Sequence, residues 1–187
     1  MKNQFKKHNI DIDEYYAHIL KELKKGISIT SSAGGRTNSM TISWGMLGIQ
    51  WNKPIFTAFI RTGRFTHKLL EQNPQFTINI PTDNRPAKIL SYLGSRSGHD
   101  EDKTGILGLH LVEGENIDVP GIAELPLTLE CNVIYKQLQQ RELFLNNNRI
   151  VEQLYPQNIP SQFSGNNCDF HTAFYGEIVG AYIIKSL

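Results

Sequence analysis

Apolar residues recur every three or four positions between residues 12 and 24, with lysines and glutamates between them. This spacing is typical of an amphipathic helix, and Gly26 is well suited to end it. After Gly26 the period changes to two. Apolar residues then alternate with small polar ones at Ile27, Ile29, Met40, Ile42 and Trp44. An alternation of this kind predicts strands.

Further strands and short helices are predicted along the rest of the chain. Apolar runs predict strands at residues 55–60, 76–80, 126–138 and 171–184. Helical spacing predicts short helices at residues 63–73, 84–93 and 148–154. Residues 94–115 are rich in glycine, serine and charge, which predicts a long loop with little structure of its own. Long loops inside a compact domain are often functional, so a ligand is expected near this one.

The order of these elements favours a mainly β fold with helices. Short strands interrupted irregularly by helices indicate an antiparallel barrel and not a parallel sheet built from βαβ units. Gly34 and Gly35 are followed by Arg36 and Thr37, so the glycine pattern of a dinucleotide-binding turn is incomplete. A Rossmann site is therefore not expected.

Composition narrows the functional classes. The 187 residues suit a single domain over residues 1–187, which can bury roughly 70% of its unfolded surface. Nineteen Lys and Arg residues against 18 Asp and Glu remove the bulk attraction that a nucleic-acid or membrane binder shows. We expect a cytoplasmic protein that binds neither nucleic acid nor membrane. Cys131 and Cys168 are predicted to be free thiols, and no metal-ligand spacing is present.

Residues 38–45, NSMTISWG, are the first candidate site. A strand here places Met40, Ile42 and Trp44 on one face and Ser39, Thr41 and Ser43 on the other. Small hydroxyls would leave the backbone accessible to a flat heteroaromatic ligand. The alternative is that the hydroxyls form the solvated face of an edge strand.

Residues 61–68, RTGRFTHK, are the second candidate site. Arg61 ends a strand, and Arg64, Thr66 and Lys68 lie near a helix start, where cations, a hydroxyl and free N–H groups suit a phosphate. A solvent-exposed helix start, with Arg61 paired to a carboxylate, is the alternative. The string at residues 95–105 could complete an anion cradle or remain a mobile charged loop. Its candidate residues are Ser95, Arg96, Ser97, Gly98 and Lys103.

The last predicted strand begins at His171, which stands at the mouth of an apolar run. Such a histidine can be a structural hydrogen-bonding group or part of a site. Glu177, inside the run, must be paired or must point outward. Gly176 and Gly180 indicate a bulge or the close approach of another backbone.

Seven strings in chain order resemble the flavin reductase-like, FMN-binding split-barrel family, and the nearest type is flavoredoxin-like. They are NSMTISWG, WNKP at 51–54, RTGRFTHK, FTINIP at 76–81, SGHDEDKTG at 97–105, LTLEC at 127–131 and HTAFYGEIV at 171–179. The resemblance implies a six-stranded antiparallel split β-barrel, a homodimer and FMN held near the subunit boundary.

The resemblance also assigns residues to the flavin. The strand from Met40 to Trp44, with Ser39 before it, is implied to lie along the isoalloxazine ring. Arg61, Arg64 and Thr66 are implied to lie near the phosphate and ribityl chain, and Ser97, Gly98 and Lys103 to close over the phosphate. His171 is implied to lie at the reactive edge of the flavin, as the catalytic candidate.

Two departures accompany this assignment. His99 stands where the family usually has arginine, which removes one positive charge, and Thr104 stands where an aromatic residue is common. The expected activity is that of an oxidoreductase in which NAD(P)H reduces FMN, which then reduces free flavin, a ferric complex or a redox partner protein. The alternatives are an FMN electron carrier without its own nicotinamide site and a non-catalytic FMN store or sensor.

Overall fold

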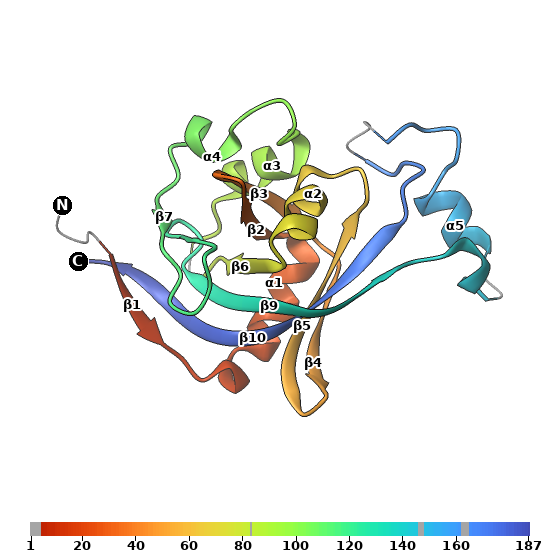
Figure 1. Cartoon of the computed structure of the whole chain (residues 1–187). Coiled ribbons are helices and arrows are strands. Elements are labelled where there is room, and N and C mark those ends of the chain that lie inside the picture. The colour runs from red at the N-terminus through yellow and green to blue at the C-terminus, as the bar shows by residue number, and fades with distance from the viewer. Residues whose placement is uncertain (1–4, 83, 146–147, 162–164) are drawn as a thin grey trace.

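The computed structural model describes residues 5–82, 84–145, 148–161 and 165–187. One antiparallel eight-stranded sheet dominates it, in the order β3-β2-β6-β9-β10-β5-β4, with β1 paired to β10 (Figure 1). A small two-stranded sheet, β7-β8, lies beside it. The strands are β1 (Phe5–Asn9), β2 (Ile27–Ala33), β3 (Arg36–Ile42), β4 (Gly45–Gln50), β5 (Lys53–Arg61), β6 (Gln75–Ile80), β7 (Leu111–Val112), β8 (Gly121–Ile122), β9 (Leu127–Leu138) and β10 (His171–Ser186).

The helices lie at different places around this sheet. In Figure 1, α2, α3 and α4 lie together at the top, and α5 lies at the far right end of β9 and β10. The helices are η1 (Ile12–Glu14), α1 (Tyr16–Lys25), α2 (Phe65–Gln72), α3 (Ala87–Ser95), α4 (Lys103–Ile106), η2 (Arg141–Leu143) and α5 (Asn148–Leu154). No helix within the described ranges is long and apolar enough to cross a membrane.

The sheet is open between β3 and β4, which are the two ends of its strand order. The chain passes from one edge to the other through Ser43 and Trp44 alone. The mainly β split-barrel class expected from the sequence is therefore confirmed. The sheet has eight strands where six were expected, in part because β1 pairs with the end of β10, with Lys7 opposite Ile184.

The barrel interior is apolar, and α1 closes it. Ile19 and Leu23 of α1 pack against a buried cluster that includes Phe56, Phe76 and Ile78. Full burial of one such side chain stabilises the fold by about 1.5–3 kcal/mol. The amphipathic pattern before Gly26 thus marked the helix that covers the core.

The expectations for Gly176, Gly180 and Glu177 in β10 are confirmed. The pairing of β10 with β9 shifts register at Gly176 and again at Gly180. A Cβ at Gly176 would lie 2.6 Å from the Phe76 ring, so the core requires glycine there. Glu177 is paired with Lys53 at 2.6 Å. Cys131 and Cys168 are both free, as expected.

Two predicted boundaries were wrong. The strand expected over residues 38–45 ends at Ile42, because the chain leaves the sheet edge there to start β4. The segment 94–115, expected to have little structure, contains α4 and β7. Asp102 caps α4, since its carboxylate accepts from the Gly105 N–H at 3.1 Å and the Thr104 hydroxyl at 2.8 Å.

Candidate functional site

A cavity of about 960 Å³ lies where the end of β3, the start of α2, the loop before α4 and the start of β10 meet. Its volume is in the range of small-molecule sites, roughly 300–1,000 Å³. All but one of the residues that the resemblance assigns to the flavin line it, although they come from four separate stretches of the chain. Lys68, the other cation proposed near the helix start, is exposed and does not line it. The assigned residues that line it are Met40, Thr41, Ile42, Ser43, Trp44, Arg61, Arg64, Thr66, Ser97, Gly98, Lys103 and His171.

The exception is Ser39, and the expected row of available hydroxyls is not formed. Ser39 is fully buried, with its hydroxyl 2.8 Å from that of Thr30 on the neighbouring strand. The Thr41 hydroxyl donates to the Leu90 carbonyl at 2.6 Å, because α3 covers this face of β3. Both hydroxyls are thus engaged within the protein, which corrects the interpretation of this face as an open platform.

One end of the cavity is cationic. Arg64, Arg96 and Lys103 line it, against the carboxylates of Asp100 and Glu101. Helix α2 begins here, with Phe65 and Thr66 in the lining and no side chain capping its first turn. Free N–H groups and the positive end of a helix dipole favour anions, so the helix start adds to the side-chain charge.

Lys103 is an unusual residue of the cationic end because its charged side chain is buried. Its side chain is buried, and its ammonium group donates to the Leu93 carbonyl at 3.0 Å and to nothing else within the described residues. Burial lowers its pKa to about 8, against the opposing effect of the Glu101 carboxylate and with a smaller contribution from the Arg64 charge in the same direction as burial. A buried ammonium with donors left over is costly to the fold and well suited to bind an anion. This donor set fits the phosphate of FMN.

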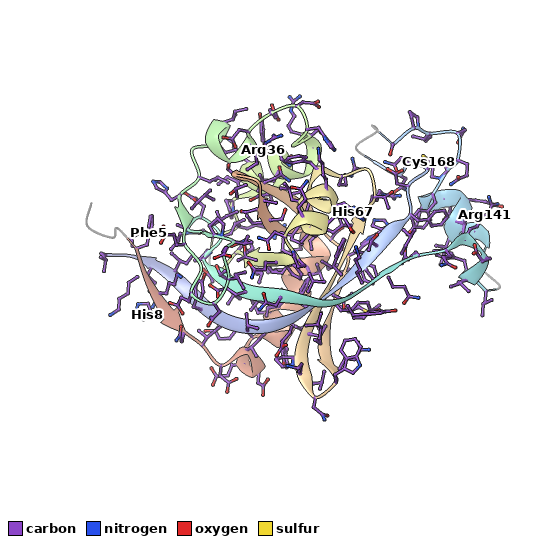
Figure 2. All side chains as sticks on the ribbon, viewed as in Figure 1. Phe5, His8, Arg36, His67, Arg141 and Cys168 are labelled. Carbon is purple, nitrogen blue, oxygen red and sulfur yellow. The ribbon has the colours of Figure 1, made fainter. Side chains whose placement is uncertain are left out.

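The loop before α4 is held against the start of α2. The Arg36 guanidinium donates to the Gly98 carbonyl at 3.0 Å and lies 4.2 Å from the centre of the Phe65 ring. A Cβ at Gly98 would lie 2.2 Å from Asn38 Oδ1, so only glycine fits. The His99 ring packs against Phe65 at 5.1 Å. In Figure 2, Arg36 is seen beside α3 and α4.

The other end of the cavity is aromatic. Trp44, Phe59 and His171 line it, and the Trp44 and His171 rings lie 4.9 Å apart. His171 is 6% exposed, and its pKa is lowered to about 3 by burial and then by the charges of Arg61 and Arg64. The imidazole is therefore neutral at physiological pH. A neutral aromatic wall of this kind suits the face of a flat ring.

A hydrogen-bonded chain fixes the tautomer of His171. The Tyr155 hydroxyl donates to Gln139 Oε1 at 2.8 Å and lies 2.9 Å from His171 Nδ1. Because the tyrosine hydroxyl has a single proton, Nδ1–H must donate to it, which leaves Nε2 as an acceptor. His171 thus combines both interpretations of the sequence, since it is hydrogen-bonded at the strand end and also lines the cavity.

Arg61 lines the cavity but uses its guanidinium to hold the segment before β10. It donates to the carbonyls of Asp169 at 2.6 Å, Leu154 at 2.8 Å and Asn167 at 3.3 Å. It also lies 5.0 Å from the centre of the Tyr155 ring. The carboxylate pairing considered for Arg61 is replaced by this set of carbonyls. Cys168 and Arg141 are seen in the same part of the molecule, next to α5, in Figure 2.

Several residues of the site were missed by sequence reasoning. Asn38 lines the cavity and donates from its amide to the Thr66 hydroxyl at 2.9 Å, which links β3 to α2. It is the first residue of the string NSMTISWG, and its amide could have marked it as a candidate. Phe59 and Asn166 also line the cavity, and Tyr155 supports His171. No sequence signal identified them, because only the fold brings Phe59, Tyr155 and Asn166 to this end of β3.

Comparisons with known proteins agree with this architecture. The family model described as "Flavin reductase like domain" matches residues 20–187. An uncharacterized protein of Archaeoglobus fulgidus is 31% identical over 99 residues, which cover 53% of this chain and only 55% of that protein.

Two solved structures share the fold. The flavoredoxin of Desulfovibrio vulgaris (Miyazaki F) has a TM-score of 0.60 at 24% identity, covering 84% of this chain and 68% of that one. The FMN-binding domain of a flavin reductase-like enzyme from Shewanella baltica OS155 has a TM-score of 0.61 at 20% identity, covering 96% and 78%. Because the family model spans most of the chain, this protein belongs to the flavin reductase-like domain family.

Proposed function

We propose that this protein binds FMN in the large cavity and is an oxidoreductase that reduces the flavin with NAD(P)H. The observation that carries the proposal is the polarity of that cavity, with buried Lys103 and half-buried Arg64 at one end and the Trp44–His171 pair at the other. A molecule with a phosphate on one side and a flat ring system on the other matches both ends. The family membership and the FMN-binding solved neighbour support the same ligand.

Each end has a distinct part in binding. Lys103, Arg64, Ser97, the Gly98 backbone and the start of α2 would hold the phosphate, with Thr66 beside them. Arg61 would act on this site by positioning the segment before β10. Met40 to Trp44 and His171 would border the ring. Bound FMN would supply the redox chemistry, and the protein would orient the ring and exclude water from one face.

His171 is the residue proposed to orient the hydride donor. Its Nε2 is an acceptor with no hydrogen bond among the described residues, and it is held by the chain through Tyr155 to Gln139. A carboxamide N–H of a nicotinamide could donate to this nitrogen. A neutral imidazole provides this contact without opposing charge.

The rival is an electron carrier without its own nicotinamide site, and one experiment separates the two. Purified protein loaded with FMN is mixed anaerobically with NADH and then with NADPH, and the flavin absorbance is followed. Bleaching without a partner protein is expected. Absence of bleaching with either nucleotide, while chemical reductants still bleach the flavin, would favour the carrier. Absence of any yellow, FMN-loaded protein would overturn both.

The proposal includes a homodimer in the cytoplasm, with free flavin or a redox protein as acceptor. Strand β4 is an edge of the sheet, and the hairpin that it forms with β5 exposes large apolar side chains. Met46 is 61% exposed, Ile49 68% and Trp51 52%. An exposed apolar edge of this kind is a pairing surface. Light scattering should give a dimer mass at micromolar concentration, and a monomer mass with FMN bound would contradict it.

A further inference from the structure

A second cavity, of about 420 Å³, lies next to the first on the side of α5. It shares only Ser43, Trp44 and Phe59 with the large cavity, so Trp44 belongs to the wall of both. The rest of its lining comes from Gly45 at the start of β4 and from the segment between β9 and β10. No part of the proposed FMN cationic end contributes to it.

The lining of this second cavity is aromatic and aliphatic. Trp44, Phe59, Phe144 and Tyr155 supply rings, and Ile150 and Leu154 supply branched chains. None of its lining residues carries a charged side chain. An ionic ligand would therefore lose its hydration without gaining a counter-charge, whereas an uncharged flat ring gains stacking and burial.

Two polar groups in the lining are available to a ligand. Gln139 uses its Oε1 to accept from Tyr155, and its amide nitrogen makes no hydrogen bond within the described residues. The Ser43 hydroxyl also makes no hydrogen bond to another described residue. Both groups can donate a hydrogen bond, and a carbonyl oxygen can accept from both.

We infer that the second cavity is a separate ligand site for an uncharged planar carbonyl compound of the quinone class. The size suits a compound of about two fused rings, since useful ligand sites begin at about 300 Å³. The inference goes beyond the proposed function and does not depend on FMN binding, because the two cavities differ in lining and in charge.

The test uses menadione, an uncharged two-ring quinone, and isothermal titration calorimetry with the full chain. Binding is measured with and without saturating FMN. Ile150→Glu places a carboxylate in the second cavity and should weaken menadione binding by about tenfold or more. Leu143→Glu is the matched control, since Leu143 is exposed on neighbouring η2 and does not line the cavity. It should leave the affinity within about twofold.

Further measurements keep the inference falsifiable. Ile150→Trp fills the cavity without adding charge and should also weaken binding, and the thermal midpoint shows that each variant is folded. Menadione sulfonate, which carries a charge, should bind at least about tenfold more weakly than menadione. No menadione binding, equal affinities for Ile150→Glu and Leu143→Glu, or displacement of menadione by FMN would each overturn the second site. FMN titrations of the same variants test the proposed function separately.

Discussion

The hydroxyl of Tyr155 lies 2.9 Å from Nδ1 of His171 and forms a hydrogen bond with this nitrogen. The two residues are 16 positions apart and meet because Arg61 draws the intervening segment against the end of β5. Since the Tyr155 hydroxyl donates its hydrogen bond to Gln139, His171 Nδ1–H donates to Tyr155 and Nε2 is left as an acceptor. Predictions about both residues follow from this relationship.

His171→Ala should leave FMN bound and slow its reduction. A contact that orients the hydride donor acts mainly in the transition state, so we expect a loss of about tenfold or more in the reduction rate, with FMN affinity within about threefold. Stopped-flow reduction of the FMN-saturated variant measures the rate. An unchanged rate with a lowered denaturation midpoint would show that His171 is only a structural hydrogen-bonding group.

Tyr155→Phe should release the tautomer of His171 without removing the ring. In the wild type, ¹⁵N NMR of the imidazole should show the proton on Nδ1, and the variant should shift toward the Nε2–H form, because the acceptor of Nδ1–H is gone. Stability should fall by about 1–3 kcal/mol through the unpaired groups left behind. An unchanged tautomer in Tyr155→Phe would contradict the hydrogen-bonded chain.

Arg64→Ala and Lys103→Ala should weaken FMN more than riboflavin, which has no phosphate. Each charge-assisted contact with the phosphate is worth about 1.5–3 kcal/mol, or roughly ten- to a hundredfold in affinity. Lys68→Ala is the matched control, because Lys68 lies on the same helix, is exposed and does not line the cavity. Fluorescence titration with both flavins provides the measurement. Equal losses for FMN and riboflavin would place Arg64 and Lys103 away from the phosphate.

The affinity for FMN should fall as the pH rises above about 8. Burial lowers the pKa of Lys103 to about 8 in the free protein, so above that pH the ammonium loses the proton that phosphate binding needs. The dissociation constant of FMN should then rise by up to about tenfold per pH unit, while that of riboflavin stays flat. Lys103→Arg keeps its charge and should remove the slope. A slope of the same size in Lys103→Arg would assign the titration to another group.

The same lysine should affect the stability of the FMN-free protein. Its folded-state pKa of about 8 lies below the ordinary 10.5, so the unfolded chain binds more protons between these values. The free energy of unfolding should therefore rise with pH across this window, by up to on the order of 3 kcal/mol in total. Urea unfolding of wild type and Lys103→Met along a pH series isolates this effect, because the variant lacks the titrating group. Parallel pH profiles for the two proteins would contradict it.

Periodicity predicted the parts of the fold that bury apolar faces. Strands β6 and β9 and helix α1 could be predicted because their apolar spacing reports burial directly. Strand β1 could not, since its Lys6, Lys7 and His8 show no apolar alternation and it is held by pairing with the edge of β10. Strand β4 was missed apart from Gly45, which was assigned to the preceding strand because no turn residue separates it clearly from Ile42.

The candidate site also contains residues that could be predicted from the sequence and residues that could not. Arg64, Gly98 and Lys103 were predicted as site residues, because charged residues and glycines in such strings indicate an anion site directly from the sequence. The fate of Ser39 and Thr41 depends on which side of β3 is covered by α3, and that packing is a long-range result. Gln139 and Tyr155 gave no signal, since their roles exist only where β9, α5 and β10 converge.

A substitution of Arg61 distinguishes a residue that binds the phosphate from one that holds the structure of the site in place. Its guanidinium donates to three backbone carbonyls between residues 154 and 169, so Arg61→Lys, which keeps the charge but loses the planar set of donors, should loosen that segment. We expect faster amide hydrogen exchange at Tyr155 and Cys168 and a stability loss of about 3 kcal/mol.

The affinities of Arg61→Lys for FMN and for riboflavin should fall by the same factor, because His171 and the segment before it border the ring in both cases. The matched comparison is Arg64→Ala, for which only FMN should be strongly affected. If Arg61→Lys weakened FMN alone and left amide exchange at Tyr155 and Cys168 unchanged, Arg61 would be a phosphate ligand. Its hydrogen bonds to the carbonyls of Leu154 and Asp169 would then be dispensable for the segment that carries Tyr155 to His171.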